Sequence, residues 1–405
     1  MAHYHPLNEA EAVAYAKRLR IFPEDARLTA REIGDGNLNL VFRIQEEATD
    51  RSIIIKQALP YARVVGDSWP LTLDRARIES EALHMEEALC PGSVPKVYHY
   101  DPHLALTVME DLSSHIVLRK GLILRRRYPK LAQHIGTFLA RTLFYTSDIA
   151  LNSRRKKEQV AQFINPEMCR ITEDLVFTDP FYNAETNRFN PLILEEVRKI
   201  WSDGRLKLEV AALKEGFLTR TQALIHGDLH TGSIMVTEQD TRVIDPEFAY
   251  YGPMGFDIGA VLANLFLNFS AQEGLTDDPA EKSEYQVYLL RTAAEIWSVF
   301  ERNFRQLWWN DGLEAFTSVH GYLDDYLERI LQDTAGYAGC KMIRRVIGLA
   351  HVADLESIED PKLRAKGETM ALAIGRELIL ARHGIQRIED ILQIVQSIRE
   401  ERIAS

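Results

Sequence analysis

Residues 224–230 read Leu-Ile-His-Gly-Asp-Leu-His, and residues 234–247 read Ile-Met-Val-Thr-Glu-Gln-Asp-Thr-Arg-Val-Ile-Asp-Pro-Glu. In the second stretch two short apolar runs flank a polar turn, a pattern that predicts a β-hairpin. Because a hairpin returns the chain to its start, Ser233 and Asp245 are expected to lie close together at the open end. Asp228 precedes them by only a few residues. Acidic groups gathered in one place are costly unless they bind a cation or act on a proton, so this stretch predicts a functional site.

Phosphoryl transfer is the chemistry that fits these acids. The transferred group needs positioning and charge neutralisation more than covalent help, so such sites place one aspartate beside the acceptor hydroxyl and a second on magnesium. The His-Gly-Asp-Leu-His sequence resembles the catalytic loop of small-molecule kinases with the protein-kinase-like fold, the group of the aminoglycoside phosphotransferases and choline kinases. This resemblance implies that Asp228 accepts or orients the hydroxyl proton and that Asp245 binds Mg²⁺.

Two positions depart from the usual pattern of that group. Ser233 stands where an asparagine commonly serves as the second metal ligand, and Asp-Pro-Glu at 245–247 replaces Asp-Phe-Gly. We expect Glu247 to take over part of the missing coordination, because Mg²⁺ prefers carboxylate oxygens. The alternative is an ordinary exposed hairpin with solvated acids, which the additional presence of His226 and Gly227 at this spacing disfavours.

Composition places the chain among ordinary soluble proteins. Its 405 residues are enough for two or three folding units, with 46% apolar and 26% charged residues. A net charge of −11 argues against general affinity for nucleic acids or anionic membranes, although it permits a locally basic nucleotide cleft. The three cysteines show neither disulfide nor zinc spacing, and the N-terminus lacks the order of a signal peptide. The most apolar run, residues 258–269, is interrupted by Asn264 and Asn268 and is too short to span a bilayer. We therefore expect a cytoplasmic protein.

The first hundred residues are predicted to form strands. Residues 8–20 have the spacing of an amphipathic helix with Asn8 as N-cap, and residues 29–44 read as strand, glycine turn and strand. Gly34 and Gly36 in that turn permit close approach of backbone N–H groups to the phosphates of ATP. A simple turn without ligand is the alternative.

Lys56 ends the buried β-branched run at residues 52–55. Its ammonium requires a polar partner, because an unpaired charge is costly in a core. In kinase folds such a lysine binds the α- and β-phosphates and pairs with a glutamate of the following helix. Residues 74–89 are the predicted helix, with Glu79 as the first candidate partner and Glu81 as the second. The alternative is a lysine that only extends its charge to solvent at a strand end.

Two further segments of this region are assigned by position. Residues 61–72 contain Gly, Pro and Trp69, and are either a packed surface loop or a lid that closes over a ligand. A second hairpin ends at Glu110, Asp111 and Leu112. In the kinase fold this linker joins two lobes, so its backbone is expected to bind adenine, and we place the lobe boundary at residue 112.

The remainder is predicted to be mainly helical, with apolar spacing near 3.6 residues. The expected helices are residues 128–147, 195–201, 206–219, 281–303 and 366–382. The predicted fold class is thus α+β: a protein-kinase-like bilobal fold with an antiparallel-sheet N-lobe (1–112, nucleotide-binding) and a mainly helical C-lobe (113–405, catalytic and substrate-binding). The basic run at 154–157 is expected to be a solvated face.

Two sites in the second lobe have open assignments. Asp257 precedes an apolar helix and suits an N-cap, and a comparable aspartate in the kinase group braces the catalytic loop. Arg344 and Arg345 project from the flank and far side of a helix whose apolar residues include Ile343 and Val346. They are either solvated or face the cleft, where guanidinium groups would stabilise the transferring phosphoryl group.

Taken together, the motifs of the whole chain resemble one family, the 5-methylthioribose kinases. The residues that carry this resemblance are 34–39 (Gly-Asp-Gly-Asn-Leu-Asn), 68–72 (Ser-Trp-Pro-Leu-Thr), 226–233 (His-Gly-Asp-Leu-His-Thr-Gly-Ser), 245–248 (Asp-Pro-Glu-Phe) and 343–345 (Ile-Arg-Arg). The Asp-Pro-Glu sequence with Ser233 separates this family from the aminoglycoside and choline enzymes.

The resemblance implies transfer of the ATP γ-phosphate to the 1-hydroxyl of 5-methylthioribose, a step of methionine salvage, by a homodimer that uses ATP and Mg²⁺. It implies that Asp228 is catalytic and contacts the sugar, that Asp245 and Glu247 bind the metal, and that Lys56 holds phosphates. The other implied assignments are Asn39 in the phosphate loop and Trp69, Arg344 and Arg345 at the substrate.

Three rival functions remain open. The first is a kinase of the same fold with an aminoglycoside or choline acceptor. Cationic acceptors usually bind in an acidic pocket, and the possible involvement of Arg344 and Arg345 counts against such a pocket. A non-catalytic, ATP-binding kinase-like protein is the second. The third is a metal-dependent hydrolase that uses His226 and His230, whose i, i+4 spacing serves a metal only on a helix, whereas Gly227 favours a loop.

Overall fold

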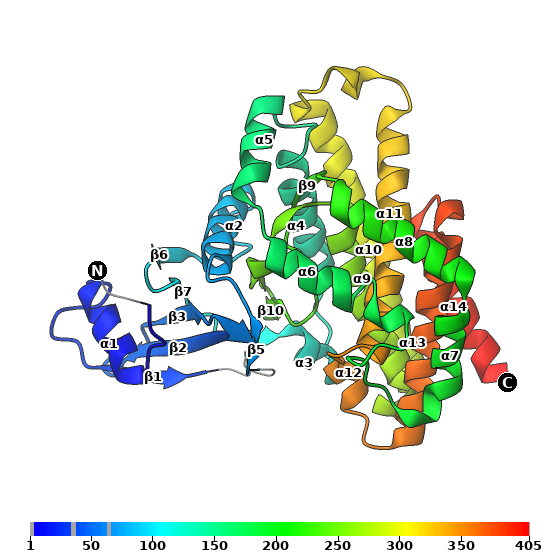
Figure 1. Cartoon of the computed structure of the whole chain (residues 1–405), viewed down its shortest axis with the longest axis horizontal. Coiled ribbons are helices and arrows are strands. Elements are labelled where there is room, and N and C mark those ends of the chain that lie inside the picture. The colour runs from blue at the N-terminus through cyan, green and yellow to red at the C-terminus, as the bar shows by residue number, and fades with distance from the viewer. Residues whose placement is uncertain (1–3, 34–37, 63–65, 405) are drawn as a thin grey trace.

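The chain forms a sheet-rich part followed by a larger helical part, in a computed structural model that describes residues 4–33, 38–62 and 66–404 (Figure 1). Five antiparallel strands make up the main sheet in the order β1-β2-β3-β7-β6. Their bounds are β1 (Leu28–Glu32), β2 (Asn39–Glu46), β3 (Ser52–Ala58), β6 (Val97–Asp101) and β7 (Leu106–Glu110). The antiparallel sheet predicted for the N-terminal region is confirmed.

Successive side chains of the central strand β3 point to opposite faces of the sheet and pack in two different hydrophobic clusters. Ile53 and Ile55 pack in the cluster that α1 (Glu9–Arg18) covers, whereas Ile54 belongs to the core shared with the helical part. Asn8 caps α1 through a capping box with Glu11, as expected. The helix α2 (Arg75–Leu89) follows the short strands β4 (Tyr61–Ala62) and β5 (Gly66–Pro70).

The predicted catalytic hairpin is present at the junction of the two parts. Strands β10 (Ile234–Val236) and β11 (Thr241–Val243) pair antiparallel, and β8 (Ile116–Val117) joins β10 on its other edge. Beside them, β9 (Ala223–Ile225) pairs with β12 (Tyr250–Gly252). The chain between β9 and β10 is thereby anchored at both ends by strands, and it contains the His-Gly-Asp-Leu-His sequence.

Helices make up most of the second part. They are α3 (Leu118–Ile123), α4 (Leu131–Tyr145), α5 (Ser153–Gln162), α6 (Pro166–Leu175), α7 (Leu194–Ser202), α8 (Gly204–Thr219), α9 (Met254–Leu275), α10 (Pro279–Asp311), α11 (Tyr322–Ile347), α12 (Ala353–Glu356), α13 (Pro361–Ala381) and α14 (Ile388–Ala404). Single 3-10 turns are η1 (Asp179–Phe181), η2 (Pro191–Ile193), η3 (Pro246–Phe248), η4 (Ala315–Ser318) and η5 (Arg382–Gly384). The five helices expected from apolar spacing are all present, with ends shifted by a few residues.

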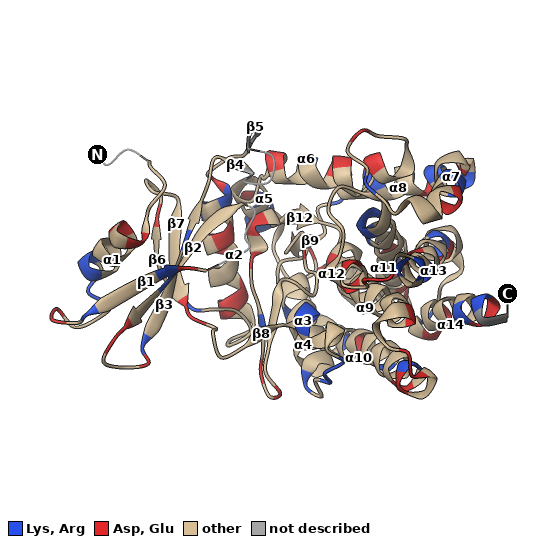
Figure 2. Ribbon diagram, turned by 90° about the horizontal axis from the view of Figure 1, so that it is seen from below, with Lys and Arg blue, Asp and Glu red and all other residues tan. Residues whose placement is uncertain are grey.

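Helix α9 is the centre of the helical part, where α10, α11 and α13 pack against it. In contrast to the shorter apolar run at residues 258–269, the whole helix is long and apolar enough to span a membrane, but that stretch is entirely buried within the fold. Figure 2 shows basic and acidic segments interspersed along the outer helices α7 and α14, while α9 is almost uncoloured. An apolar helix enclosed by amphipathic ones is the core of a globular unit.

Two expectations for this part were wrong in detail. Lys156, within the basic run expected to be solvated, is only 3% exposed. Its ammonium donates to the carbonyls of Thr146 and Gln222 and lies over the ring of Tyr251. Asp257 is not an N-cap, because α9 begins at Met254 with Pro253 in the cap position.

Candidate active site

A cleft of about 260 Å³ lies between the main sheet and the catalytic hairpin. Its lining residues are Ile33, Asn39, Val41, Ile54, Lys56, Glu79, Pro95, Met109, Glu110, Asp111, Leu112, Ser113, Met235, Ile244 and Asp245. Seven of the residues predicted to bind nucleotide are in this set, so the fold brings them to one place. Gly34 and Gly36 lie outside the described residues, and so does the side chain of Trp69.

Lys56 is the central cation of the cleft. Its ammonium donates to Glu79 Oε1 at 2.7 Å and also pairs with Asp245. Of the two candidate glutamates the structure selects Glu79, since Glu81 pairs with Arg77 instead. Burial raises the pKa of the Glu79 carboxyl, against the lowering effect of Lys56. The lysine is thus held within β3, two residues before its end, with its charge directed toward Asp245 after the catalytic hairpin.

Arg75 is a buried partner of Glu247 that the sequence did not reveal. The guanidinium is fully buried and donates at 2.6 Å to Glu247 Oε2 and to Asn39 Oδ1. It also donates to the carbonyls of Leu38 and Leu59. Burial alone would raise the pKa of Glu247, but Arg75 and Lys56 hold it below its ordinary value. The start of α2, the start of β2 and the Asp-Pro-Glu turn are therefore tied together by one side chain.

Asp245 and Glu247 have oxygens suited to a divalent cation. The Asp245 carboxylate lines the cleft and its side chain is 44% exposed, in a left-handed backbone conformation (φ 73°) that aspartate tolerates better than most residues. Glu247 Oε2 is occupied by Arg75, but the contact of Oε1 with Asn39 Nδ2 is long, at 3.4 Å. Among the described residues no group of three His, Cys, Asp or Glu is placed to hold a metal, so nucleotide phosphates and water would complete the shell of Mg²⁺.

The linker at Glu110, Asp111 and Leu112 closes one end of the cleft. The Asp111 carboxylate accepts hydrogen bonds from Arg43 and Ser52, and the Glu110 carboxylate accepts one from Lys96 N. Both carboxylates are thus held by partners within the protein, and all three linker residues line the cleft.

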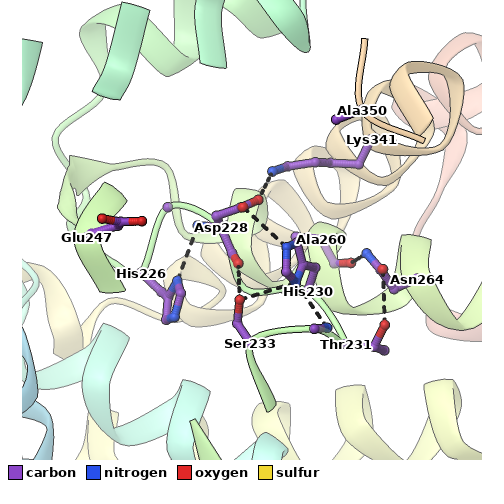
Figure 3. A network of polar contacts seen from close by, with 12 residues as sticks. His226, Asp228, His230, Thr231, Ser233, Glu247, Ala260, Asn264, Lys341 and Ala350 are labelled. Atoms are coloured by element: carbon purple, nitrogen blue, oxygen red, sulfur yellow. Dashed lines mark hydrogen bonds and ion pairs between the residues drawn. The ribbon is translucent and has the colours of Figure 1, made fainter. Parts of the chain in front are cut away.

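Asp228 lies between a lysine and a histidine at the far side of the hairpin (Figure 3). Lys341 of α11 donates to Asp228 Oδ1 at 3.0 Å, and His230 Nε2 is 3.4 Å from Oδ2. Burial acts to raise the pKa of Asp228, but Lys341, His230 and the two arginines of α11 lower it well below its ordinary value. Asp228 is therefore a carboxylate across the neutral pH range, able to accept a hydrogen bond from a hydroxyl.

The catalytic loop itself is held by backbone contacts. The Asp257 carboxylate accepts from His226 N at 2.6 Å and from Gly227 N at 3.0 Å. Gly227 has φ 82°, and a Cβ there would meet the Phe248 carbonyl at 2.3 Å, so only glycine fits. The Nδ1 atom of His226 accepts from Asp228 N, which leaves Nε2–H to donate to the Ile244 carbonyl. The bracing role expected for Asp257 is confirmed.

We expect Asp257→Asn to reduce kcat about 10- to 100-fold, because an amide in this position directs N–H atoms at backbone N–H groups and loosens the loop. Steady-state kinetics with varied ATP measure the effect, and KM for ATP is expected to stay unchanged. Asp311→Asn, which alters an exposed pair with Tyr145, is the control. Equal losses in the two variants would contradict the bracing role.

Arg344 and Arg345 are not solvated. Arg345 is 8% exposed, Arg344 is half-buried, and both donate to the Ala350 carbonyl. Burial lowers the pKa of both guanidinium groups, and Asp228 is among the nearby charges that act on each of them. With Lys341 and Arg119 they surround Asp228 and Asp354 with more positive than negative charge. Such a surface suits an anionic phosphoryl group.

Lys341 is the main site residue that sequence reasoning missed. It lies in the predicted late helix, where a lysine is ordinarily solvated. The available signal was its position between the apolar residues Cys340, Met342 and Ile343, which places a charge on a buried face. The metal-hydrolase reading of His226 and His230 is disfavoured, because backbone hydrogen bonds occupy the Nδ1 atoms of both rings.

A cleft that contains a paired lysine, with one aspartate just after the hairpin and a second on the loop before it, is the arrangement expected of a small-molecule phosphotransferase. Residues 29–296 match the phosphotransferase enzyme family. Methylthioribose kinase from Geobacillus sp. is 51% identical over 388 residues, 96% of this chain and 95% of the relative. Methylthioribose kinase from Bacillus pumilus is 48% identical over 400 residues, 98% of this chain and 99% of the relative.

Among solved structures, choline kinase from Cryptosporidium parvum aligns over 98% of this chain and 98% of its own, with 13% identity and a TM-score of 0.47. The near-complete sequence matches decide the assignment: the chain belongs to the phosphotransferase enzyme family and, within it, to the methylthioribose kinases. The expected protein-kinase-like fold class is confirmed.

Proposed function

We propose that this chain transfers the γ-phosphoryl group of ATP to the 1-hydroxyl of 5-methylthioribose, forming 5-methylthioribose 1-phosphate and ADP in methionine salvage. The observation that carries the proposal is about 50% identity to methylthioribose kinases over nearly the whole chain. The basic surroundings of Asp228 also favour a neutral sugar acceptor over a cationic one such as choline.

In this proposal the cleft binds ATP with the adenine at the backbone of Glu110, Asp111 and Leu112. Lys56 holds the phosphates, and Gly34, Gly36 and Asn39 belong to the loop that covers them. Asp245 and Glu247 would hold Mg²⁺, which supplies charge neutralisation and orientation of the phosphates. Glu79 keeps Lys56 in place through the 2.7 Å contact.

At the acceptor side, Asp228 orients the sugar hydroxyl and takes its proton as the new O–P bond forms. An anomeric hydroxyl is more acidic than an ordinary alcohol, so a carboxylate of low basicity suffices for this proton. Arg344 and Arg345 stabilise charge on the transferring group, and Trp69 closes over the sugar. We further propose a boundary between lobes at residue 112 and a homodimer, which rest on the family resemblance, and a cytoplasmic location, which rests on the composition of the chain.

Acceptor specificity is the direct test. We expect ADP release with Mg-ATP to depend on 5-methylthioribose and to be at least about 100-fold slower with ribose, choline or kanamycin, because each loses fitted contacts or adds an opposed charge. A coupled ADP assay with a no-acceptor blank measures it, and phosphorus NMR of the product checks the 1-phosphate. Faster turnover of choline or kanamycin would overturn the substrate assignment. ATP binding without any turnover would overturn the enzymatic one.

A further inference from the structure

Lys341 is a buried charge in the C-terminal third of the core helix α11. Its side chain is 5% exposed, and its ammonium lies 4.5 Å from the centroid of the Phe256 ring. Burying an ammonium is costly unless it is paired. The pairing is supplied by Asp228 Oδ1 at 3.0 Å, across 113 residues of sequence. A lysine at this depth that donates to the proposed catalytic carboxylate bears directly on how that carboxylate works.

The other oxygen of Asp228 is held more loosely. Gly232 N donates to His230 Nδ1 at 3.0 Å, and a backbone N–H can only donate, so Nδ1 is the acceptor atom of this ring. Burial lowers the pKa of His230 well below its ordinary value, so the ring is neutral with its proton on Nε2. That N–H faces Asp228 Oδ2 at 3.4 Å, longer than a normal hydrogen bond. The Asp228 side chain is 22% exposed, which leaves it accessible to a ligand.

We infer that Lys341 is a positioning residue for phosphoryl transfer: it holds Oδ1 of Asp228 ionised and in place, and leaves Oδ2 to receive the acceptor hydroxyl. This inference rests on the proposed function. In the transfer the sugar oxygen bonds to the γ-phosphorus, and the bond to the bridging oxygen breaks with its electron pair left on ADP. The hydroxyl proton passes to Asp228 Oδ2 and then to solvent.

The charged and titratable groups that face Asp228 come from several elements. They are Lys341, Arg344 and Arg345 of α11 and His226 and His230 of the catalytic loop, while Asp257 of α9 and Arg119 of α3 act on these neighbours of Asp228. Lys341 is the cation in direct contact with the carboxylate, and it has the largest lowering effect on the pKa of Asp228. Without Lys341, the raising effect of burial on the pKa of Asp228 is opposed by the more distant arginines. The acidic limb of the pH profile of kcat should then move to higher pH.

The test compares Lys341→Met and Lys341→Arg with a matched control, Lys156→Met. Lys156 is also a buried lysine over an aromatic ring, but it bonds to backbone carbonyls and not to Asp228. In Lys341→Met we expect kcat at pH 8 to fall on the order of tenfold with KM for ATP unchanged. The acidic limb of the pH profile of kcat should move to higher pH by about 1–3 units, the usual effect on a pKa of one adjacent opposite charge. Lys341→Arg should return the limb toward the wild-type position.

The control variant Lys156→Met should lose thermal stability, but the acidic limb of its kcat profile should stay at the wild-type pH. The inference would be overturned if the acidic limb of Lys341→Met did not shift. It would also be overturned if the acidic limb of Lys341→Arg stayed at the same pH as that of Lys341→Met. A second readout needs no turnover: carbon NMR of carboxyl-labelled aspartate, assigned through Asp228→Asn, titrates Asp228 directly. An equal Asp228 pKa in wild type and Lys341→Met also overturns it. A wild-type chain inactive on 5-methylthioribose would refute the proposed function instead, and the NMR titration would still decide the Lys341 contact.

Discussion

Replacing Asp228 with asparagine is expected to lower kcat for 5-methylthioribose by about 10²–10⁴-fold, the usual contribution of a positioned general base. The amide has nearly the same shape but neither accepts the hydroxyl proton nor carries the charge that Lys341 pairs with. ATP binding should change by less than about twofold, because Asp228 is not among the residues that line the nucleotide cleft. Initial rates of ADP release and calorimetric titration with ATP measure the two quantities.

Asp240→Asn is the matched control for this prediction. Asp240 lies in the turn of the hairpin that follows the catalytic loop, where it pairs with the partly buried side chains of Arg242 and His115. Its replacement should leave kcat within about twofold, because none of these three residues lines the cleft or is among the charges that act on Asp228. Near-normal turnover in Asp228→Asn would remove Asp228 from its proposed catalytic role. A comparable loss in Asp240→Asn would show that the hairpin is merely sensitive to any change.

Replacing Arg75 with methionine is expected to lower the free energy of unfolding by about 3–5 kcal/mol, as does removal of one partner from a buried ion pair. The guanidinium is fully buried, and its loss removes a hydrogen-bond donor from the Glu247 carboxylate and from the carbonyls of Leu38 and Leu59. Urea unfolding followed by circular dichroism measures the change. Arg77→Met is the control: this neighbour on α2 pairs with Asp74 and Glu81 at the surface, and its loss should cost less than about 1 kcal/mol.

The Arg75 effect also has a pH signature. Because the folded pKa of Glu247 is lowered, its contribution to stability is present above the unfolded pKa of about 4.3 and is lost as the pH falls through the folded value. The stability gap between wild type and Arg75→Met should therefore narrow below about pH 4. The double variant Arg75→Met/Glu247→Gln should regain part of the stability at neutral pH but not the activity. A gap that does not change with pH, or no recovery in the double variant, would contradict the ion-pair explanation.

Local pattern was sufficient for much of this fold. The apolar runs around the 237–241 turn predicted the hairpin, and the β-branched run before Lys56 predicted a buried strand with a charge at its end. Both signals depend on side-chain alternation and turn chemistry within a few residues, which the sequence displays directly. The pairing of Lys56 with Glu79 was reachable in the same way, because a helix follows the strand and few glutamates were available.

Contacts between distant segments were not predictable in this way. Arg75 and Glu247 are separated by 172 residues, and Lys341 and Asp228 by 113. Each lysine or arginine looks like a surface residue in its own helix, since exposure is the ordinary state of these side chains. Only the packing of α2 against the Asp-Pro-Glu turn and of α11 against α9 puts these charges in the interior.

The sequence by itself determined the hairpin, the strand that presents Lys56 and the acids that carry the proposed chemistry, because these follow from local periodicity and residue type. The tertiary structure decided which cations neutralise those acids and which oxygen of Asp228 stays open. The physical reason is that the cost of burying a charge is set by the partner it meets across the fold, and that partner is chosen by packing rather than by neighbours along the chain.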